Sequence, residues 1–114
     1  MKAAQQTIRN APPANLKVHL EGISKTFTSS GRALPVLENV DFYADEGEFV
    51  SIIGPSGCGK STLLNIIAGL EEPTRGSIWL DSGSASRRLG AVGYMHQKDL
   101  LLPWRTVLDN VVLG

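Results

Sequence analysis

The sequence has little of several features that define a function class on their own. It has one cysteine, Cys58, so it cannot form an internal disulfide, and a single thiol fits a reducing compartment. Eleven Lys and Arg balance eleven Asp and Glu, which leaves no basic surplus for nucleic acid or anionic lipid. No apolar run approaches the roughly 20 residues of a spanning helix. We therefore expect a cytoplasmic protein that reaches a membrane only through a partner.

The start of the chain also lacks the apolar stretch of a secretory signal. Residues 1–15 are polar or small, contain Pro12-Pro13 and show no periodicity, which predicts a flexible leader. The rest of the chain is typical of a globular domain, with 42% apolar and 19% charged residues overall. We expect one ordered unit over residues 16–114.

Strand patterns dominate the first part of that unit. Leu16, Val18 and Leu20 alternate with polar residues, as in a half-buried strand. The run 49–53 is almost wholly apolar, which is typical of a strand buried on both faces of a parallel sheet. Further strands are predicted at 36–43, 77–80 and 91–95, and turns at 28–31, 45–47 and 71–76.

Two helices are predicted. The first begins near Lys60, is apolar around most of its circumference through Ala68, and should end at Gly69. The second should run through residues 107–112, with Thr106 as its N-cap and Asp109 in its first turn.

A glycine-rich loop joins the apolar run to the first helix. Its spacing, Gly54-x-x-x-x-Gly59-Lys60-Ser61, matches the P-loop pattern in its required strand–loop–helix context. Glycines at 54, 57 and 59 allow positive φ and let backbone N–H groups turn inward around an anion. The positive end of the helix adds to this attraction. The segment Gly54–Ser61, which we call the phosphate loop, therefore predicts a nucleoside triphosphate site.

Side chains complete the predicted site. Lys60 supplies a mobile cation for the β- and γ-phosphates, and the Ser61 hydroxyl can ligate Mg²⁺ together with phosphate oxygens. Cys58 lies near a helix N-terminus, which can lower a thiol pKa, but it also fits a variable loop position that donates only its N–H. The predicted triphosphate-binding residues are Gly54, Pro55, Ser56, Gly57, Cys58, Gly59, Lys60, Ser61 and Thr62.

The residues around the loop add a more specific signal. The stretch Gly47-Glu48-Phe49-Val50-Ser51-Ile52-Ile53 before it and Thr62-Leu63-Leu64-Asn65-Ile66-Ile67-Ala68-Gly69-Leu70 after it resemble the ATP-binding cassettes of ABC transporters. The resemblance continues through Glu72-Pro73-Thr74-Arg75-Gly76 to Tyr94-Met95-His96-Gln97. It implies an α/β P-loop NTPase core with an N-terminal antiparallel β-subdomain, a mixed sheet around 49–53, and the start of a helical subdomain. ATP and Mg²⁺ are the implied ligands.

The resemblance also implies roles for single residues. Phe27 corresponds to an aromatic that stacks on adenine, although it could instead be an aromatic packed at a strand end. Gln97 corresponds to a glutamine that reaches Mg²⁺ or the attacking water, and with Lys60 it is the expected catalytic residue; its plain alternative is a polar residue at a strand end. His96 does not correspond to the catalytic histidine of the family, which lies much later in such domains.

The stretch from Asp99 to Val111 resembles importers of nitrate, sulfonate and taurine. In such proteins the surface corresponding to Leu101–Trp104 faces the transmembrane permease subunit, and it could equally be core of the helical subdomain. A second ATP-binding domain, as a homodimer in the full protein, is the other implied partner. These partners would place the protein peripherally on the inner face of the cell membrane.

Three further family motifs do not occur in these 114 residues: the Leu-Ser-Gly-Gly-Gln signature, the Asp-Glu pair and the switch histidine. The resemblance therefore implies an N-terminal portion of a cassette, incomplete at its C-terminal side, and gives ATP binding without giving turnover to this chain alone. The leading hypothesis is an ATP-binding subunit of an ABC importer for small molecules. A non-catalytic nucleotide-binding fragment and another P-loop kinase or GTPase stay open. A half-built sheet also predicts marginal stability.

Overall fold

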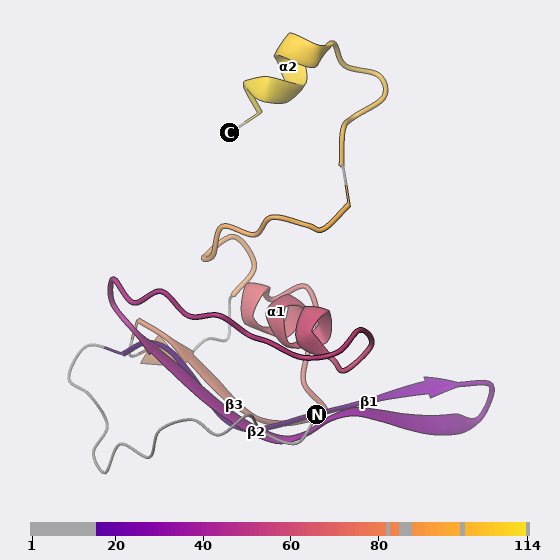
Figure 1. The fold of residues 1–114 in the computed structure, drawn as a ribbon, viewed down its shortest axis with the longest axis vertical. Helices are drawn as coiled ribbons and strands as arrows, with labels where there is room; N and C mark the ends of the chain where they lie inside the picture. The colour runs from indigo at the N-terminus through magenta and orange to yellow at the C-terminus, as the bar shows by residue number, and fades with distance from the viewer. Residues whose placement is uncertain (1–15, 82, 85–87, 99, 114) are drawn as a thin grey trace.

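The computed structural model describes residues 16–81, 83–84, 88–98 and 100–113, so the predicted leader lies outside the described residues. Its elements are β1 (Leu16–Ser29), β2 (Arg32–Asp45), α1 (Lys60–Ala68), β3 (Arg75–Leu80), β4 (Gly83–Ser84) and α2 (Val107–Val111). The strands form an antiparallel sheet in the order β2-β1-β3-β4. α1 lies over this sheet, and an extended segment leads away from it to α2 (Figure 1).

A tight hairpin starts the sheet. The two-residue turn between β1 and β2 is Ser30-Gly31, and both residues have positive φ, 50° and 74°. That combination matches the right-handed twist of paired strands. Ser29 pairs directly with Arg32, so β2 begins four residues earlier than the sequence pattern predicts. The predicted turn is confirmed, and the hairpin is longer than expected.

The core lies between the sheet and α1. Each of its side chains contributes about 1.5–3 kcal/mol of transfer free energy on burial. Its fully or nearly buried members come from β1, β2, β3 and α1 and are Leu20, Ile23, Leu37, Val40, Ile78, Leu63, Ile66 and Ile67. This layer fixes the position of α1, and therefore of the loop at the start of α1, relative to β2.

The ends of α1 agree with the prediction. The helix begins at Lys60 and is followed by Gly69 in the left-handed conformation, φ 77°. The Gly69 N–H donates to Ile66 O and the Leu70 N–H to Asn65 O, which satisfies the last carbonyls of the helix. The apolar residues of α1 are not buried around its whole circumference, because Leu64 is 41% exposed.

Two predicted strands are wrong. Residues 49–53 and 91–95 form no strand, and the described sheet is antiparallel, not mixed. Phe49 is 91% exposed, Ile53 86% and Met95 93%; only Ile52 of the first run packs against the core. A strand needs a neighbouring strand for its N–H and C=O groups, and no described segment pairs with either run. Apolar composition predicted burial that these residues do not have.

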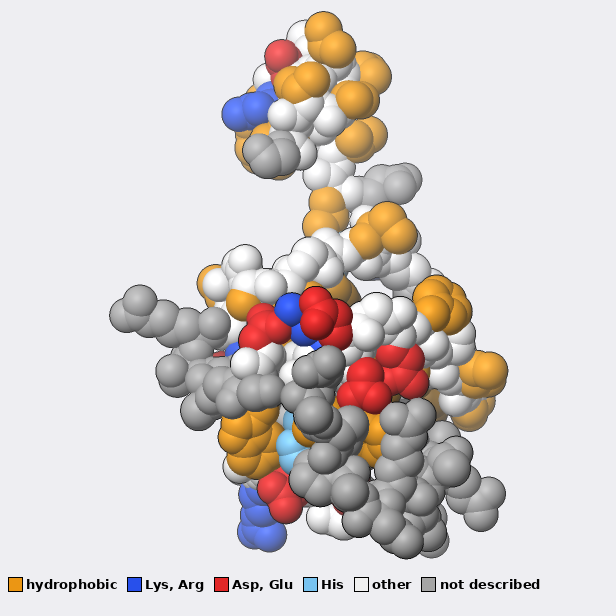
Figure 2. Space-filling model, turned by 90° about the vertical axis from the view of Figure 1, so that its left-hand side faces the viewer, with side chains coloured by type: hydrophobic (Ala, Val, Ile, Leu, Met, Phe, Trp, Pro, Cys, Tyr) orange, Lys and Arg blue, Asp and Glu red, His pale blue; other side chains and the backbone are white. Residues whose placement is uncertain are grey.

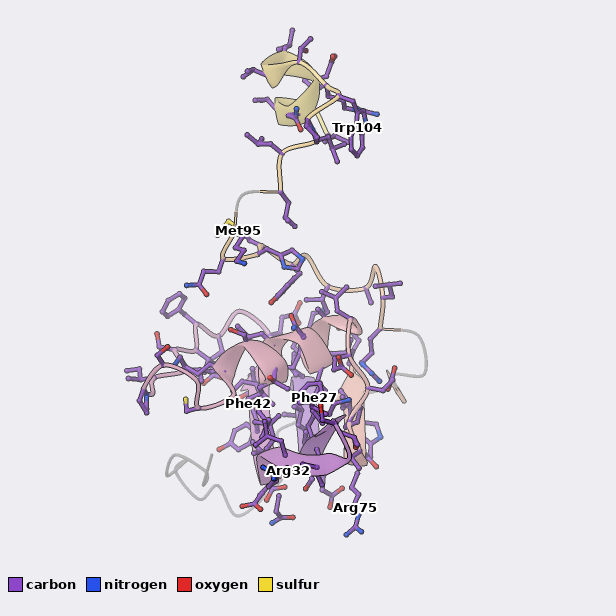
Figure 3. The ribbon with its side chains drawn as sticks, turned by 90° about the vertical axis from the view of Figure 1, so that its right-hand side faces the viewer. Phe27, Arg32, Phe42, Arg75, Met95 and Trp104 are labelled. Atoms are coloured by element: carbon purple, nitrogen blue, oxygen red, sulfur yellow. The ribbon has the colours of Figure 1, made fainter. Side chains whose placement is uncertain are left out.

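α2 is short and lies apart from the sheet. As predicted, Thr106 caps it: Thr106 Oγ1 accepts from the Asp109 N–H at 3.1 Å and donates to Asp109 Oδ2 at 2.7 Å. None of its residues is buried. Figure 3 shows Trp104 beside α2 and Met95 on the extended segment between α1 and α2.

Candidate functional site

The phosphate loop bends tightly before α1. Gly57 and Gly59 have φ of 78° and 101°, as the loop pattern predicts, whereas the expected positive φ at Gly54 is not found. The Cys58 N–H donates to Pro55 O at 3.3 Å inside the loop, and the Leu63 N–H donates to Gly59 O at 2.9 Å as the helix begins. Because no side chain caps α1 and its first turn holds no acidic residue, the N-terminal N–H groups face no competing anion from the helix itself.

The glycine at 59 is required by packing as well as by φ. A Cβ there would lie 2.8 Å from Leu37 Cδ2, 3.1 Å from Val36 O and 3.2 Å from Val36 Cγ1. The loop therefore rests directly on β2. At Gly57 a Cβ would meet nothing within 4 Å, so that glycine serves only the backbone conformation.

Lys60 folds back over its own loop. Its Nζ donates to Gly54 O at 2.6 Å and to Pro55 O at 2.7 Å, and lies 3.6 Å from Cys58 Sγ. The Cys58 side chain is thus packed inside the loop, where a Cβ on Gly54 would come within 2.8 Å of the sulfur. The ammonium is held by neutral carbonyl groups, which a phosphate oxygen can replace as a stronger, charge-assisted partner.

A cavity of about 430 Å³ opens beside the loop. Its volume is in the range of ligand sites. Its lining comes from the loop, the start of α1, β2 and the segment after α1: Val36, Ser56, Gly57, Gly59, Lys60, Ser61, Thr62 and Gln97. The structure therefore brings Gln97 to the same cavity as Lys60 and Ser61. Val36 on β2 also lines the cavity, a role for which the sequence pattern gave no signal.

Phe27 is not among the residues that line this cavity. It lies near the hairpin end of β1, opposite Leu34, and is 36% exposed. Lys25 Nζ lies 5.0 Å from the centroid of its ring, within cation–π range. The structure thus gives Phe27 a contact within β1 and does not bring it to the phosphate loop.

Arg88 lies at the C-terminal end of α1, away from the phosphate loop, and sequence reasoning missed its structural role. Residues 81–88 read as a polar loop, yet Arg88 is only 8% exposed. Its Nε donates to Ile66 O at 3.1 Å and its Nη2 to Glu72 Oε2 at 2.7 Å. An arginine at the carbonyl end of a helix also complements the helix dipole. No local pattern could have identified an acceptor 22 positions away.

A sheet packed against one helix, with a glycine-rich loop at the N-terminus of that helix, defines an α/β protein of the P-loop class. A family model described as ABC transporter matches residues 37–112. The chain therefore belongs to the ABC transporter family, as the sequence resemblance implies.

Similar proteins agree with this assignment. The aliphatic sulfonates import ATP-binding protein SsuB of Bacillus cereus is 44% identical over 96 residues, which cover 84% of this chain and 38% of the relative. SsuB 1 of Rhodococcus jostii is 53% identical over 83 residues, 73% of this chain and 33% of that protein. The chain spans between a third and two fifths of the curated relatives it matches.

Solved structures give the same fold. The dimeric ATP-binding cassette MJ0796, bound to ADP and Pi in a post-hydrolysis state, superposes with a TM-score of 0.75 at 38% identity, over 84% of this chain and 45% of that one. A second dimeric structure of MJ0796 gives 0.74 at 37% identity, over 82% and 44%. The predicted cassette fold with its antiparallel β-region is therefore confirmed, and the chain is part of such a cassette.

Exposed apolar side chains gather on and before α2. Leu101, Trp104, Val107, Leu108, Val111, Val112 and Leu113 are each at least half exposed, and we call them the apolar patch. Figure 2 shows hydrophobic side chains gathered over the α2 end of the molecule. Among the described residues, no helix has both the length and the apolar character needed to cross a bilayer.

Proposed function

We propose that this chain is the part of an ABC importer's ATP-binding subunit that holds the triphosphate of ATP. The observation that carries the proposal is the common cavity: Gln97, 37 positions after Lys60, lines the same space as the phosphate loop. The distance between Gln97 and the phosphate loop along the sequence does not by itself require the two to meet in space. Relatives whose names describe sulfonate import, and a cassette bound to ADP and Pi, support the same reading.

In this proposal the backbone supplies most of the phosphate contacts. Gly57 and Gly59 allow the loop to curve, and the uncapped N-terminus of α1 contributes N–H groups and its dipole. Lys60 leaves the carbonyls of Gly54 and Pro55 and pairs with the terminal phosphates. The rest of the loop, Ser56, Cys58 and Thr62, is proposed to contact phosphate by N–H or hydroxyl.

Mg²⁺ fits the oxygen donors at this site. Ser61 offers a hydroxyl and Gln97 a side-chain carbonyl, both of which suit a hard cation. The described residues contain no group of three or more His, Cys, Asp or Glu that could hold a metal ion. The ion would therefore depend on phosphate oxygens and water for its other ligands, and when bound it would neutralise phosphate charge.

The proposed partners follow from the exposed surface. The apolar patch includes Leu101 and Trp104, 71% and 76% exposed, and apolar side chains gathered in this way mark interaction sites. We propose that the Leu101–Trp104 region contacts a transmembrane permease subunit, which would hold the protein at the inner face of the membrane. A second ATP-binding domain is the other proposed partner, consistent with the dimeric MJ0796 structures.

A titration of the chain with a fluorescent ATP analogue tests the triphosphate site. Lys60→Ala should weaken binding about 10- to 100-fold, because a charge-assisted hydrogen bond contributes about 1.5–3 kcal/mol. Lys17→Ala is the matched control: it also removes one positive charge, but on β1, where Lys17 pairs with Asp81. Equal affinities for wild type and Lys60→Ala would contradict the proposal.

Two further measurements separate the alternatives. Competition by unlabelled GTP that is stronger than competition by ATP would favour a GTPase. Release of inorganic phosphate above that of Lys60→Ala would eliminate the non-catalytic fragment, since the variant lacks the proposed phosphate-binding ammonium.

A further inference from the structure

A side-chain hydrogen bond links the segment that carries Gln97 to the helix that carries Lys60. The Tyr94 hydroxyl donates to Asn65 Oδ1 at 2.7 Å, and both residues are half-buried. Asn65 lies five positions after Lys60 on α1, and Tyr94 lies three positions before Gln97. The bond therefore joins the two parts of the chain that line the cavity.

We call residues 88–97 the glutamine segment. It forms no strand, and Leu89 and Met95 are 71% and 93% exposed. At its beginning, Arg88 is attached to the carbonyl of Ile66 on α1. At its end, the bond from Tyr94 is the attachment to α1 nearest to Gln97 that the described residues show.

The contact of Tyr94 with His96 extends this attachment toward Gln97. The two rings meet edge to face with centroids 4.6 Å apart, an arrangement that aromatic rings favour. It restricts the chain direction in the residues immediately before Gln97. The sequence of contacts thus runs from Asn65 through Tyr94 and His96 to the cavity.

We propose that Tyr94 and Asn65 are a positioning pair that holds Gln97 at the phosphate cavity. α1 is a rigid element, so Asn65 keeps a fixed offset of about 6 Å along the axis from Ser61, at 1.5 Å per residue. A bond to Asn65 therefore sets Gln97 relative to the Ser61 hydroxyl. This inference rests on the proposed function, in which Ser61 and Gln97 act together on Mg²⁺.

The test compares ATP affinity with and without Mg²⁺ for the 114-residue chain and its variants. Tyr94→Phe removes only the hydroxyl, and Asn65→Leu removes the acceptor while keeping a good helix former. Each should reduce the gain in affinity caused by Mg²⁺ about 2- to 10-fold, the effect of one hydrogen bond, and leave Mg²⁺-free affinity unchanged. The double variant should lose no more than either single variant.

Two variants complete the design. Gln97→Ala should abolish most of the Mg²⁺-dependent gain, and Tyr43→Phe is the hydroxyl-matched control. Tyr43 follows Phe42, which packs against the core, so it lies on the opposite face of the sheet from α1. It should behave as wild type.

The outcomes separate this inference from the proposed function. No Lys60-dependent binding in the wild-type chain would overturn both. Lys60-dependent binding with an unchanged Mg²⁺ gain in Tyr94→Phe, or in Gln97→Ala, would overturn the positioning pair alone. Equal losses of affinity with and without Mg²⁺ in both single variants would show a structural role for the bond, which also overturns the inference.

Discussion

Gly59 is the point at which the phosphate loop, β2 and α1 meet, and its replacement by alanine tests how the site is supported. The residue has φ of 101°, where an L side chain costs about 1–2 kcal/mol. The new Cβ would also lie 2.8 Å from Leu37 Cδ2 and 3.1 Å from Val36 O. Leu37 is 1% exposed, so it has little room to move.

The steric conflict adds to the backbone cost. Overpacking of a well-filled core costs about 1–3 kcal/mol, so Gly59→Ala should destabilise the chain by about 2–5 kcal/mol in all. Gly47→Ala is the matched control, because Gly47 also has positive φ, 74°, but a Cβ there meets nothing within 4 Å. Gly47→Ala should destabilise the chain only through the cost of positive φ for an L residue, about 1–2 kcal/mol.

Urea unfolding followed by far-UV circular dichroism measures the difference. The midpoint of Gly59→Ala should fall about 1 M below that of Gly47→Ala, because the overpacking cost of about 1–3 kcal/mol is divided by slopes of about 1–3 kcal/mol/M for small proteins. Because the chain is expected to be marginally stable, all three proteins are measured in the same concentration of trimethylamine N-oxide, which stabilises the folded state and supplies the native baseline that a midpoint requires. Equal midpoints for the two variants would refute the claim that the loop rests on β2.

Three further predictions concern other contacts. Arg88→Met should destabilise the chain by about 1–3 kcal/mol in the same urea assay, because it removes the hydrogen bonds from Arg88 to Ile66 O and Glu72 Oε2; unchanged stability would contradict this. Pairing with Asp81 raises the pKa of Lys17 above 10.5, first by the hydrogen bond and then by charge. The stability contributed by this pairing is fully present below pH 10.5 and is lost as the pH rises through the pKa of Lys17 in the folded state. An NMR titration should show the raised pKa of Lys17. High salt should reduce the shift, and Asp81→Asn should abolish it. Thr106→Ala should speed amide exchange within α2, whose N-cap it removes, without shifting the global urea midpoint; a large shift would show that α2 belongs to the core.

Local chemistry was sufficient to predict several elements. The Ser30-Gly31 turn, the stop at Gly69 and the cap at Thr106 each depend on one or two residues whose conformational preferences are strong on their own. The phosphate loop belongs with them, since glycine spacing before a helix largely determines its backbone. These are the features for which sequence and structure agree.

Features that depend on distant partners could not be predicted in this way. Arg88 reads as a loop residue, and only the fold brings it to Ile66 O. Val36 lines the cavity from β2, whereas Phe27, which pairs with Leu34 only two residues away, does not line it. The placement of Gln97 was expected only from family resemblance, and the bond from Tyr94 to Asn65, which we propose positions it, has no sequence signature.

The two strands that do not form bear on stability. Burial of Phe49 and Ile53, now 91% and 86% exposed, would contribute about 1.5–3 kcal/mol for each side chain. Residues 49–53 lead directly into the phosphate loop, and only Ile52 among them packs against the core. The loop is therefore supported by this one side chain and by Val36 and Leu37 of β2. A core that leaves these side chains in water should be marginal, which is why we expect no cooperative thermal transition at an ordinary mesophile temperature. ATP should therefore stabilise the loop and α1, because a ligand that binds only the folded state stabilises it by an amount that grows with the logarithm of the ligand concentration divided by Kd.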